Sequence, residues 1–311
     1  MSNSKFIFGI HHAALRVKNL DEARARWSHV LGLSGERSGD EALLRCTHED
    51  VALRLIQSSD TPGIEYVAYE LAPGITLAAA KARLVAKGIA CRDVVVPMRG
   101  AGLRLSDPDG NGVVLIERRR PHNALPAEVQ YSNVIPGFHP RKFGHVNYLT
   151  SDVKRAVAWY IEVLDFHLTD WIAEEGCWLH VNPDHHVLAF VEKGVNHIHH
   201  IAFELVDWGE MRVAFDHLAQ NKCQVVWGPG RHGIARNLFS YFRMPEEDLF
   251  VELFCDLEQL PIDHEPRIYP DDTHTSNTWG RLPPRSYFRF DAEAIALEVL
   301  GLQEMGKAII A

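Results

Sequence analysis

The stretch Asn196–Trp208 places three histidines within four positions and then continues as an apolar strand. Successive side chains of an extended strand point to opposite faces, so we expect His199 on one face and His200 on the other. One imidazole should therefore point into the interior, where it is a hydrogen-bonded core residue, a metal ligand or a proton-transfer group. The partners supplied by the rest of the chain decide between these roles.

A repeat in the chain supplies such partners. "HHAALRVKNLDEARARWSHVLGL" aligns with "GHVNYLTSDVKRAVAWYIEVLDF", so that His12 matches His145. Each copy predicts a short strand, a polar turn and an amphipathic helix of about 12 residues. Farther along, "GIEYVAYEL" mirrors "HIHHIAFEL", and "LRLSDPDGNGVVLIE" mirrors "LFSYFRMPEEDLFVELF". Repetition on this scale predicts two domains of one architecture.

The predicted fold class is α+β, with duplicated βαβββ modules in two homologous domains that each enclose a curved mixed sheet. The expected boundaries are an N-terminal domain over 1–120, without a complete metal site, and a Pro-containing linker over 121–141. A catalytic, metal-binding domain is expected over 142–262. Residues 263–311 are expected to form a lid or tail with a terminal helix.

The duplication also acts as an internal control on the histidines. In the C-terminal half, His145, His200 and Glu252 fall on three separate predicted strands. The matching positions in the N-terminal half are His12, Tyr66, and Val114 or Leu115, depending on how the unequal turns are aligned. Only the C-terminal half therefore keeps a full set of potential ligands.

Two imidazoles and one carboxylate from three strands are typical of a non-haem Fe(II) or Mn(II) centre with open coordination positions. A structural zinc site normally has a fourth ligand, usually cysteine. Of the five cysteines, only Cys255 lies beside one of these positions. His197 and His199 are expected at the surface or behind the ligands.

Composition limits the partners. The formal charge is -9 and the pI is near 6.0, without basic runs that could meet phosphates, which disfavours nucleic acid and anionic membranes. The odd number of cysteines and the absence of a CxxC motif fit reduced thiols in the cytosol. No run of about 18 apolar residues is present. We expect a cytoplasmic protein that binds small molecules.

Four motifs in order, "GHVNYLTSD", "HHIAFEL", "GPGRHG" and "SYFRMPEEDLFVELF", resemble the type I extradiol ring-cleaving dioxygenases of the vicinal oxygen chelate superfamily. The similarity is greatest to the branch that acts on catechols such as homoprotocatechuate. It covers nearly the whole chain, and "TWGRLPPRSYF" resembles that branch's C-terminal lid. The resemblance implies cleavage of a catechol by O2 at Fe(II), with Mn(II) as the other metal that the same ligands accept.

The resemblance also implies roles for individual residues. The metal ligands fall on His145, His200 and Glu252. His186 corresponds to the acid-base histidine, which accepts a phenolic proton and later returns it. The other active-site positions implied by the resemblance are Trp178, His232 and Tyr241. From the residues alone, the less favoured alternative for His186 is a solvated turn residue of "PDHHV", and the less favoured alternative for Trp178 and Tyr241 is a role as packing aromatics.

Two features depart from the family pattern. The turn before Glu252 is "MPEED", one residue longer than usual, so the register of Glu252 depends on how the hairpin absorbs that residue. Trp227 stands where the related enzymes carry an arginine that meets an acidic substrate. An indole in that place favours a neutral or aromatic ring substituent. Trp227 and Arg231 are expected to bind substrate, and Arg281 is another available cation.

Two other functions compete with the dioxygenase, and the positions of the potential ligands argue against both. One is a different metal enzyme of the same superfamily, such as a glyoxalase-like isomerase, which usually draws ligands from both halves or subunits. The other is a non-catalytic protein that binds aromatic ligands. For all three, the expected partners are small molecules, with O2 as co-substrate in the dioxygenase, and the resemblance implies a homotetramer or homodimer.

Overall fold

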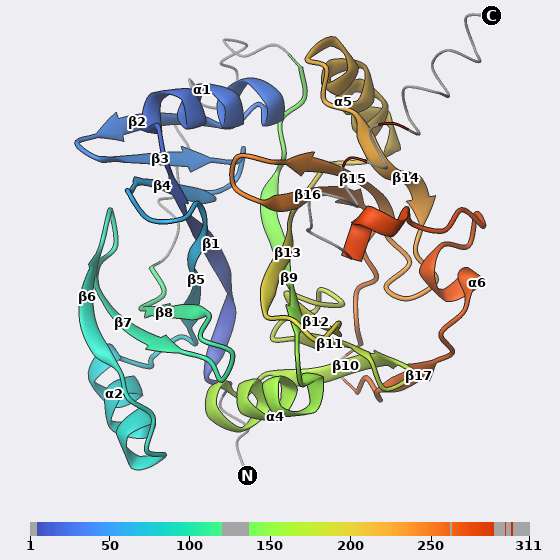
Figure 1. Cartoon of the computed structure of the whole chain (residues 1–311). Helices are drawn as coiled ribbons and strands as arrows, with labels where there is room; N and C mark the ends of the chain where they lie inside the picture. The colour runs from blue at the N-terminus through green and yellow to red at the C-terminus, as the bar shows by residue number, and fades with distance from the viewer. Residues whose placement is uncertain (1–4, 120–136, 262, 289–295, 297–299, 301–311) are drawn as a thin grey trace, which may run out of the picture.

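The computed structural model describes residues 5–119, 137–261, 263–288, 296 and 300. Most of the expected linker over 121–141 lies outside these residues, and so does most of the terminal helix expected in the tail. Two curled mixed sheets lie side by side, with the helices on their outer sides (Figure 1).

The first sheet has eight strands in the order β2-β3-β4-β1-β5-β8-β7-β6. Its elements are β1 (Ile7–Val17), α1 (Leu20–Leu31), β2 (Ser34–Ser38), β3 (Glu41–Arg45), β4 (Leu53–Gln57), β5 (Gly63–Leu71), α2 (Leu77–Ala86), β6 (Arg92–Val96), β7 (Gly100–Ser106) and β8 (Gly112–Ile116). The chain thus runs twice through a βαβββ module. The two modules join where β1 pairs with β5 in antiparallel fashion.

The second sheet repeats this plan and gains a ninth strand, in the order β14-β15-β16-β13-β9-β12-β11-β10-β17. Its elements are β9 (Lys142–Thr150), α4 (Val153–Leu164), β10 (His167–Ile172), β11 (Gly176–His180), β12 (Leu188–Glu192), β13 (His197–Glu204), α5 (Trp208–Gln220), β14 (Val225–Arg231), β15 (Leu238–Met244), β16 (Leu249–Cys255) and β17 (Arg267–Tyr269). Helix α6 (Thr273–Ser276) and a 3-10 turn (Arg285–Phe288) follow. The added strand β17 comes from the predicted tail.

The predicted duplication is confirmed at the level of fold class. Helices α1, α4 and α5 are capped at their N-termini by Asn19, Asp152 and Asp207, whose side chains each accept a backbone N–H from the first turn. Their apolar stripes face the sheets: Trp27 and the aligned Tyr160 are both fully buried. The second sheet extends to β17 and so takes in part of the predicted tail. The division into domains over 1–120 and 142–262 remains a prediction.

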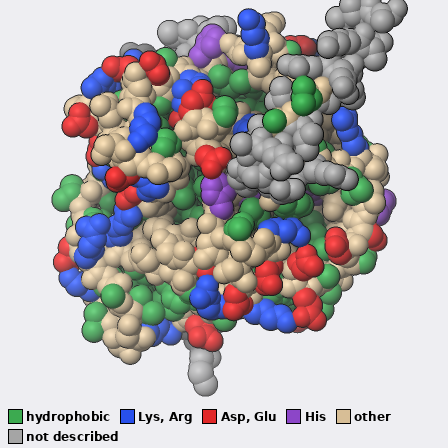
Figure 2. Space-filling model, in the orientation of Figure 1, with side chains coloured by type: hydrophobic (Ala, Val, Ile, Leu, Met, Phe, Trp, Pro, Cys, Tyr) green, Lys and Arg blue, Asp and Glu red, His purple; other side chains and the backbone are tan. Residues whose placement is uncertain are grey.

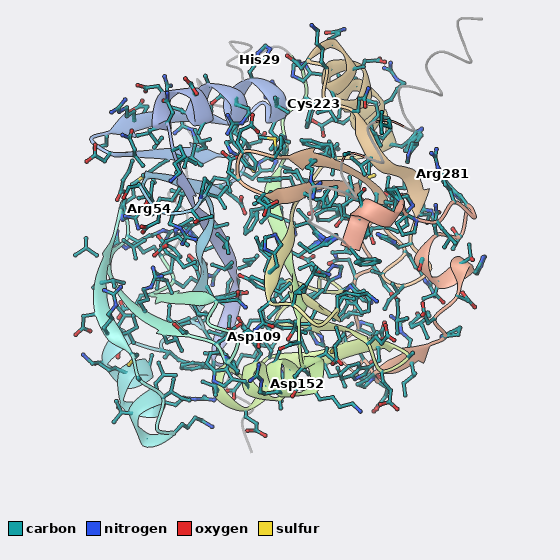
Figure 3. The ribbon with its side chains drawn as sticks, in the orientation of Figure 1. His29, Arg54, Asp109, Asp152, Cys223 and Arg281 are labelled. Carbon is teal, nitrogen blue, oxygen red and sulfur yellow. The ribbon has the colours of Figure 1, made fainter. Side chains whose placement is uncertain are left out.

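The two halves share one hydrophobic core and are tied by polar contacts. Asp109, in the turn between β7 and β8, accepts a hydrogen bond from the Thr150 hydroxyl at 2.6 Å and pairs with Arg155 of α4. Figure 3 labels Asp109 and Asp152, the N-cap of α4, in the same lower part of the molecule. These contacts fix the β9 end of the second sheet against the first half.

The outer surface carries mixed charges. On the face shown in Figure 2, Lys and Arg side chains are interspersed with Asp and Glu side chains. Among the described residues, no helix has the length and apolar character needed to cross a membrane.

Candidate metal centre and active site

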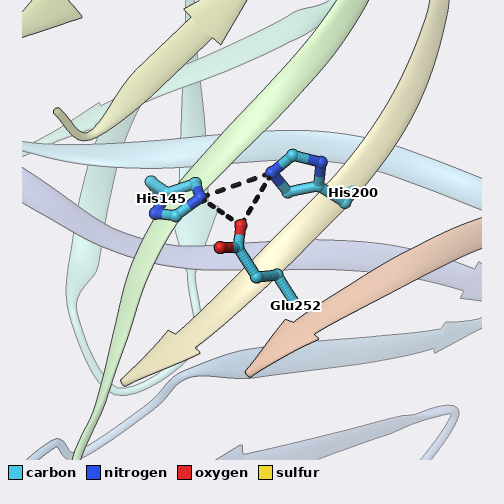
Figure 4. A group of neighbouring side chains, drawn as sticks. All are labelled: His145, His200 and Glu252. Atoms are coloured by element: carbon cyan, nitrogen blue, oxygen red, sulfur yellow. Dashed lines mark hydrogen bonds and ion pairs between the residues drawn. The ribbon is translucent and has the colours of Figure 1, made fainter. Parts of the chain in front are cut away.

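Three adjacent strands, β16, β13 and β9, carry the predicted ligands. Ala202 on β13 pairs with His145 on one side and with Glu252 on the other, and His200 lies two residues before Ala202. The Nε2 atom of His145 lies 2.9 Å from Glu252 Oε2, and His200 Nε2 lies 3.2 Å from the same oxygen (Figure 4). The two Nε2 atoms are 3.3 Å apart. The structure therefore brings the three predicted residues to one point.

This arrangement fits a metal ion. Ligand atoms that sit about 2.1 Å from a metal at right angles to one another are about 3.0 Å apart, close to the separations found here. Burial lowers the pKa of His200 to about 4, so its imidazole is neutral and offers a lone pair. Burial alone raises the pKa of Glu252, but His145 and His200 together hold it well below its ordinary value. Two imidazoles and a carboxylate thus converge, the donor set that binds a divalent cation.

The longer "MPEED" turn does not disturb the register of Glu252. Its first residue, Met244, ends β15, and 245–248 connect that strand to β16, with Asp248 at a positive φ of 52°. The following strand pairs regularly, with Glu252 opposite Tyr241. The extra residue is absorbed in the turn, and the carboxylate points inward.

Simple alternation along β13 is wrong for its histidines. Both His199 and His200 are buried, and both line the same cavity. The pairing between β13 and β9 shifts register between Ile198 and His200, and such a bulge breaks the alternation of faces. His199 lies behind His200, with the two Nδ1 atoms 2.7 Å apart.

His186 lies beside the ligands rather than in a solvated turn. Its ring centroid is 4.2 Å from that of His145, and the side chain lines the cavity. Its Nδ1 lies 3.0 Å from Nδ1 of His185, whose Nε2 lies 2.9 Å from Asp170. Burial, followed by the nearby His145, lowers the pKa of His186 well below its ordinary value.

His232 and Tyr241 form a second pair at the cavity wall. The Nδ1–H of His232 donates to the Ser276 carbonyl at 2.7 Å, which leaves its Nε2 to accept from the Tyr241 hydroxyl at 3.1 Å. The Tyr241 ring centroid is 5.2 Å from that of His200. Burial raises the pKa of Tyr241 well above its usual range, so its hydroxyl remains a donor.

Aromatic side chains make up much of the remaining cavity wall. Trp178 and Trp227 line it, together with Tyr287 and Phe288 from the C-terminal segment. The indole of Trp227 stacks on Tyr241 with centroids 5.5 Å apart, and its N–H donates to the Arg281 carbonyl at 2.9 Å. The C-terminal segment thus contributes part of the cavity wall.

The two arginines considered for substrate binding lie elsewhere. The Arg231 guanidinium donates to the Arg236 carbonyl and to Asp256 at 3.1 Å, and it is not among the residues lining the cavity. This placement is at odds with the expectation for Arg231. Arg281 lies at the edge of the molecule (Figure 3) and is exposed. Among the described residues that line the cavity, the one Lys or Arg side chain is that of Lys193, and its ammonium pairs with Glu175 at 3.1 Å.

The N-terminal half holds a different arrangement at the matching place. His12 pairs with Ala68, which pairs with Val114, so Val114 is the counterpart of Glu252. The Tyr66 hydroxyl lies 3.2 Å from His12 Nε2 and accepts a hydrogen bond from Arg54 at 2.8 Å. A missing carboxylate and an adjacent guanidinium both disfavour a cation here.

Several residues of the site were not foreseen from the sequence. Asn237, just before β15, donates to the outer oxygen of Glu252 at 3.0 Å. Asp170 and His185 form the network behind His186, and Tyr287 receives a hydrogen bond from His199 at its carbonyl. The "PDHHV" pair was visible as adjacent histidines, but Asn237 carries no signal that distinguishes it from a turn residue.

A duplicated curled sheet with one His-His-Glu centre facing an aromatic cavity defines a metal-dependent protein of the vicinal oxygen chelate type. Residues 9–115 and 142–247 match the model of the Glyoxalase/Bleomycin resistance protein/Dioxygenase superfamily. The chain belongs to this superfamily.

Individual relatives agree with this assignment. Metapyrocatechase 2 from Cupriavidus necator is 26% identical over 271 residues, which cover 82% of this chain and 83% of the relative. Homoprotocatechuate 2,3-dioxygenase from Arthrobacter globiformis superposes with a TM-score of 0.81 at 20% identity, covering 92% of each chain. A Mn(II)-bound glyoxalase from Novosphingobium aromaticivorans superposes with a TM-score of 0.76 at 22% identity, covering 88% of this chain and 91% of that one. The two structural matches are evidence for the fold, and they include both kinds of enzyme.

Proposed function

We propose that this protein is an extradiol dioxygenase, which opens a catechol ring beside its two hydroxyl groups and adds both atoms of O2. The observation that carries the proposal is the His145, His200 and Glu252 centre, with an imidazole and a phenol next to it in the same cavity. The product is a muconic semialdehyde, as expected for a step in the degradation of aromatic compounds.

The metal and the side chains have separate tasks in this proposal. A bound Fe(II) or Mn(II) supplies Lewis acidity and a site where catechol and O2 meet. His186 accepts a phenolic proton as the catechol binds and returns it when the ring opens. The Tyr241 hydroxyl donates to His232 Nε2 in the absence of substrate. When substrate is bound, this O–H turns from His232 toward oxygen atoms on which negative charge develops. The aromatic walls exclude water and hold the ring flat against them.

The cavity favours a neutral catechol. Trp227 occupies the place of a fixed positive charge and offers apolar area instead. Lys193 is the cation at the wall, but Glu175 neutralises it and its ammonium lies 5.0 Å from the Phe288 ring. An acidic substituent would therefore find no unpaired cation among the described lining residues.

A glyoxalase-like isomerase is the second candidate, because a glyoxalase shares this fold. Such an enzyme does not use O2 and needs no histidine that transfers protons during ring cleavage, whereas His186 lies next to His145 here. The N-terminal counterpart of the centre lacks a carboxylate and carries Arg54 instead. These features favour the dioxygenase over the isomerase, and the intact ligand set favours an enzyme over a non-catalytic aromatic-binding protein.

Anaerobically reconstituted protein, loaded separately with Fe(II) and Mn(II), tests the proposal. With 4-methylcatechol we expect O2 uptake equal to catechol consumed, a yellow product and a product mass that exceeds the catechol by one O2. Turnover of the glutathione hemithioacetal of methylglyoxal without O2 uptake would favour the isomerase instead. Comparing the two loaded forms identifies the metal, and sedimentation of the same samples tests the proposed homotetramer or homodimer.

A further inference from the structure

A buried chain of polar side chains leads away from the cavity behind His186. His186 Nδ1 lies 3.0 Å from His185 Nδ1, and His185 Nε2 lies 2.9 Å from Asp170 Oδ2. His185 and Asp170 are fully buried, and His186 is 4% exposed. Neither His185 nor Asp170 lines the cavity, so neither can touch a substrate there.

Donor counting fixes where the protons lie in this chain. Arg267 donates to both carboxylate oxygens of Asp170, at 2.7–3.1 Å, which keeps Asp170 ionised and able only to accept. His185 must then carry its proton on Nε2, and its Nδ1 is left as an acceptor in the neutral ring. The 3.0 Å contact between the two Nδ1 atoms therefore requires His186 to donate from Nδ1. The remaining nitrogen of His186, Nε2, is then an unprotonated acceptor.

We propose that Asp170 and His185 are positioning residues that hold His186 in the tautomer whose Nε2 accepts a proton from the substrate. This inference rests on the proposed dioxygenase function. The same chain orients the ring, because rotation of His186 would break the Nδ1 contact. Once Nε2 is protonated, the hydrogen bonds to His185 and Asp170 stabilise the cation that forms.

The network is fixed from outside by the C-terminal segment. Arg267 lies on β17, which pairs with β10 and places Arg267 opposite Asp170. Arg267 also binds Glu258 at 2.8 Å, so its guanidinium is held on two sides. The Thr169 hydroxyl donates to the His185 carbonyl at 2.8 Å. The added strand of the second sheet thus has a function in the site as well as in the fold.

The test compares two catechols of similar size and different acidity, 4-methylcatechol and the more acidic 4-chlorocatechol. Asp170→Asn replaces the acceptor with an amide that can donate to His185 Nε2, which reverses both protons and leaves N–H on the cavity nitrogen of His186. For metal-loaded protein we expect kcat on 4-methylcatechol to fall by about 10²-fold or more, the lower end for loss of general base help. The KM and the metal content should stay near those of the parent. On 4-chlorocatechol, which loses its proton more readily, the decrease should be about tenfold smaller.

Two further variants keep the test decisive. His185→Phe removes the link without adding a donor and should give the same difference between the two catechols, and it carries the test if Asp170→Asn does not fold. Thr169→Val is the matched control, because it removes a buried hydrogen bond to His185 without touching the ring contacts. It should slow both catechols equally or not at all. The inference would be overturned if Asp170→Asn and His185→Phe turned over at the rate of the parent protein, or if they slowed both catechols equally. A parent protein that consumes no O2 with either catechol would instead overturn the proposed function.

Discussion

The hydrogen bond from Asn237 to the Glu252 carboxylate gives a quantitative prediction about metal affinity. Both residues are 1% exposed, and the amide donates to Oε1 at 3.0 Å while Oε2 faces the two imidazoles. A hydrogen bond to a charged group contributes roughly 1.5–3 kcal/mol. At about 1.4 kcal/mol for each factor of ten, Asn237→Ala should weaken metal binding by about 10- to 100-fold. Residues behind metal ligands typically have effects of this size.

Competition between the protein and a chromophoric chelator for Mn(II) measures this change without interference from iron oxidation. Ser240→Ala is the matched control. Ser240 lies three residues after Asn237, and its hydroxyl is buried and has no hydrogen-bond partner in the described structure. It should bind Mn(II) as the parent does. Equal affinity for Asn237→Ala and the parent would refute the reasoning, and so would an equal loss in Ser240→Ala.

Three other predictions concern proton transfer, specificity and pH. His186→Asn should keep its metal while turnover falls by about 10²–10⁴-fold, whereas Glu252→Ala should lose the metal. Metal analysis and kcat, measured on both variants, separate the two effects. Loss of metal from His186→Asn would show that His186 is a ligand. Trp227→Arg should raise kcat/KM for homoprotocatechuate relative to kcat/KM for 4-methylcatechol by about 10- to 100-fold, because a contact with a charged group contributes roughly 1.5–3 kcal/mol. An unchanged ratio would contradict the proposal that residue 227 faces the ring substituent. Burial raises the pKa of Glu49 from 4.5 to about 8. Because the folded chain then binds this proton more tightly, the contribution of Glu49 to the free energy of unfolding is full below 4.5 and declines as pH rises through about 8. Metal-free Glu49→Gln should show a flatter decline between pH 4.5 and about 8 in urea unfolding, and parallel profiles would argue against it.

The ligands were predictable because duplication compares each strand with a copy of itself. His145 and His200 sit at positions where the first half has His12 and Tyr66, and the contrast marks the half that keeps a full set. Strand register then links Glu252 to Ala202, which decides between Val114 and Leu115 as its counterpart. The alternation of side chains along a strand and the repeat between the two halves can both be read from a single sequence, so the ligand positions could be predicted.

Features that arise from bulges and long-range contacts could not be predicted in the same way. The bulge between Ile198 and His200 places both His199 and His200 in the cavity, and no residue type announces it. The contact of Asp170 with Arg267 joins strands that are far apart in the chain. Arg231 was expected to bind substrate, but its guanidinium pairs with the nearby Asp256 and does not line the cavity.

Titration of metal into metal-free protein, with O2 uptake on 4-methylcatechol recorded at each step, tests the central claim most directly. The C-terminal centre is the one group of three potential ligands found in the described residues. Activity should therefore rise linearly and reach its plateau at one Fe(II) or Mn(II) for each chain, and Glu252→Ala should show no such rise. Full activity without metal, a plateau at two metals for each chain, or an active Glu252→Ala would contradict the account.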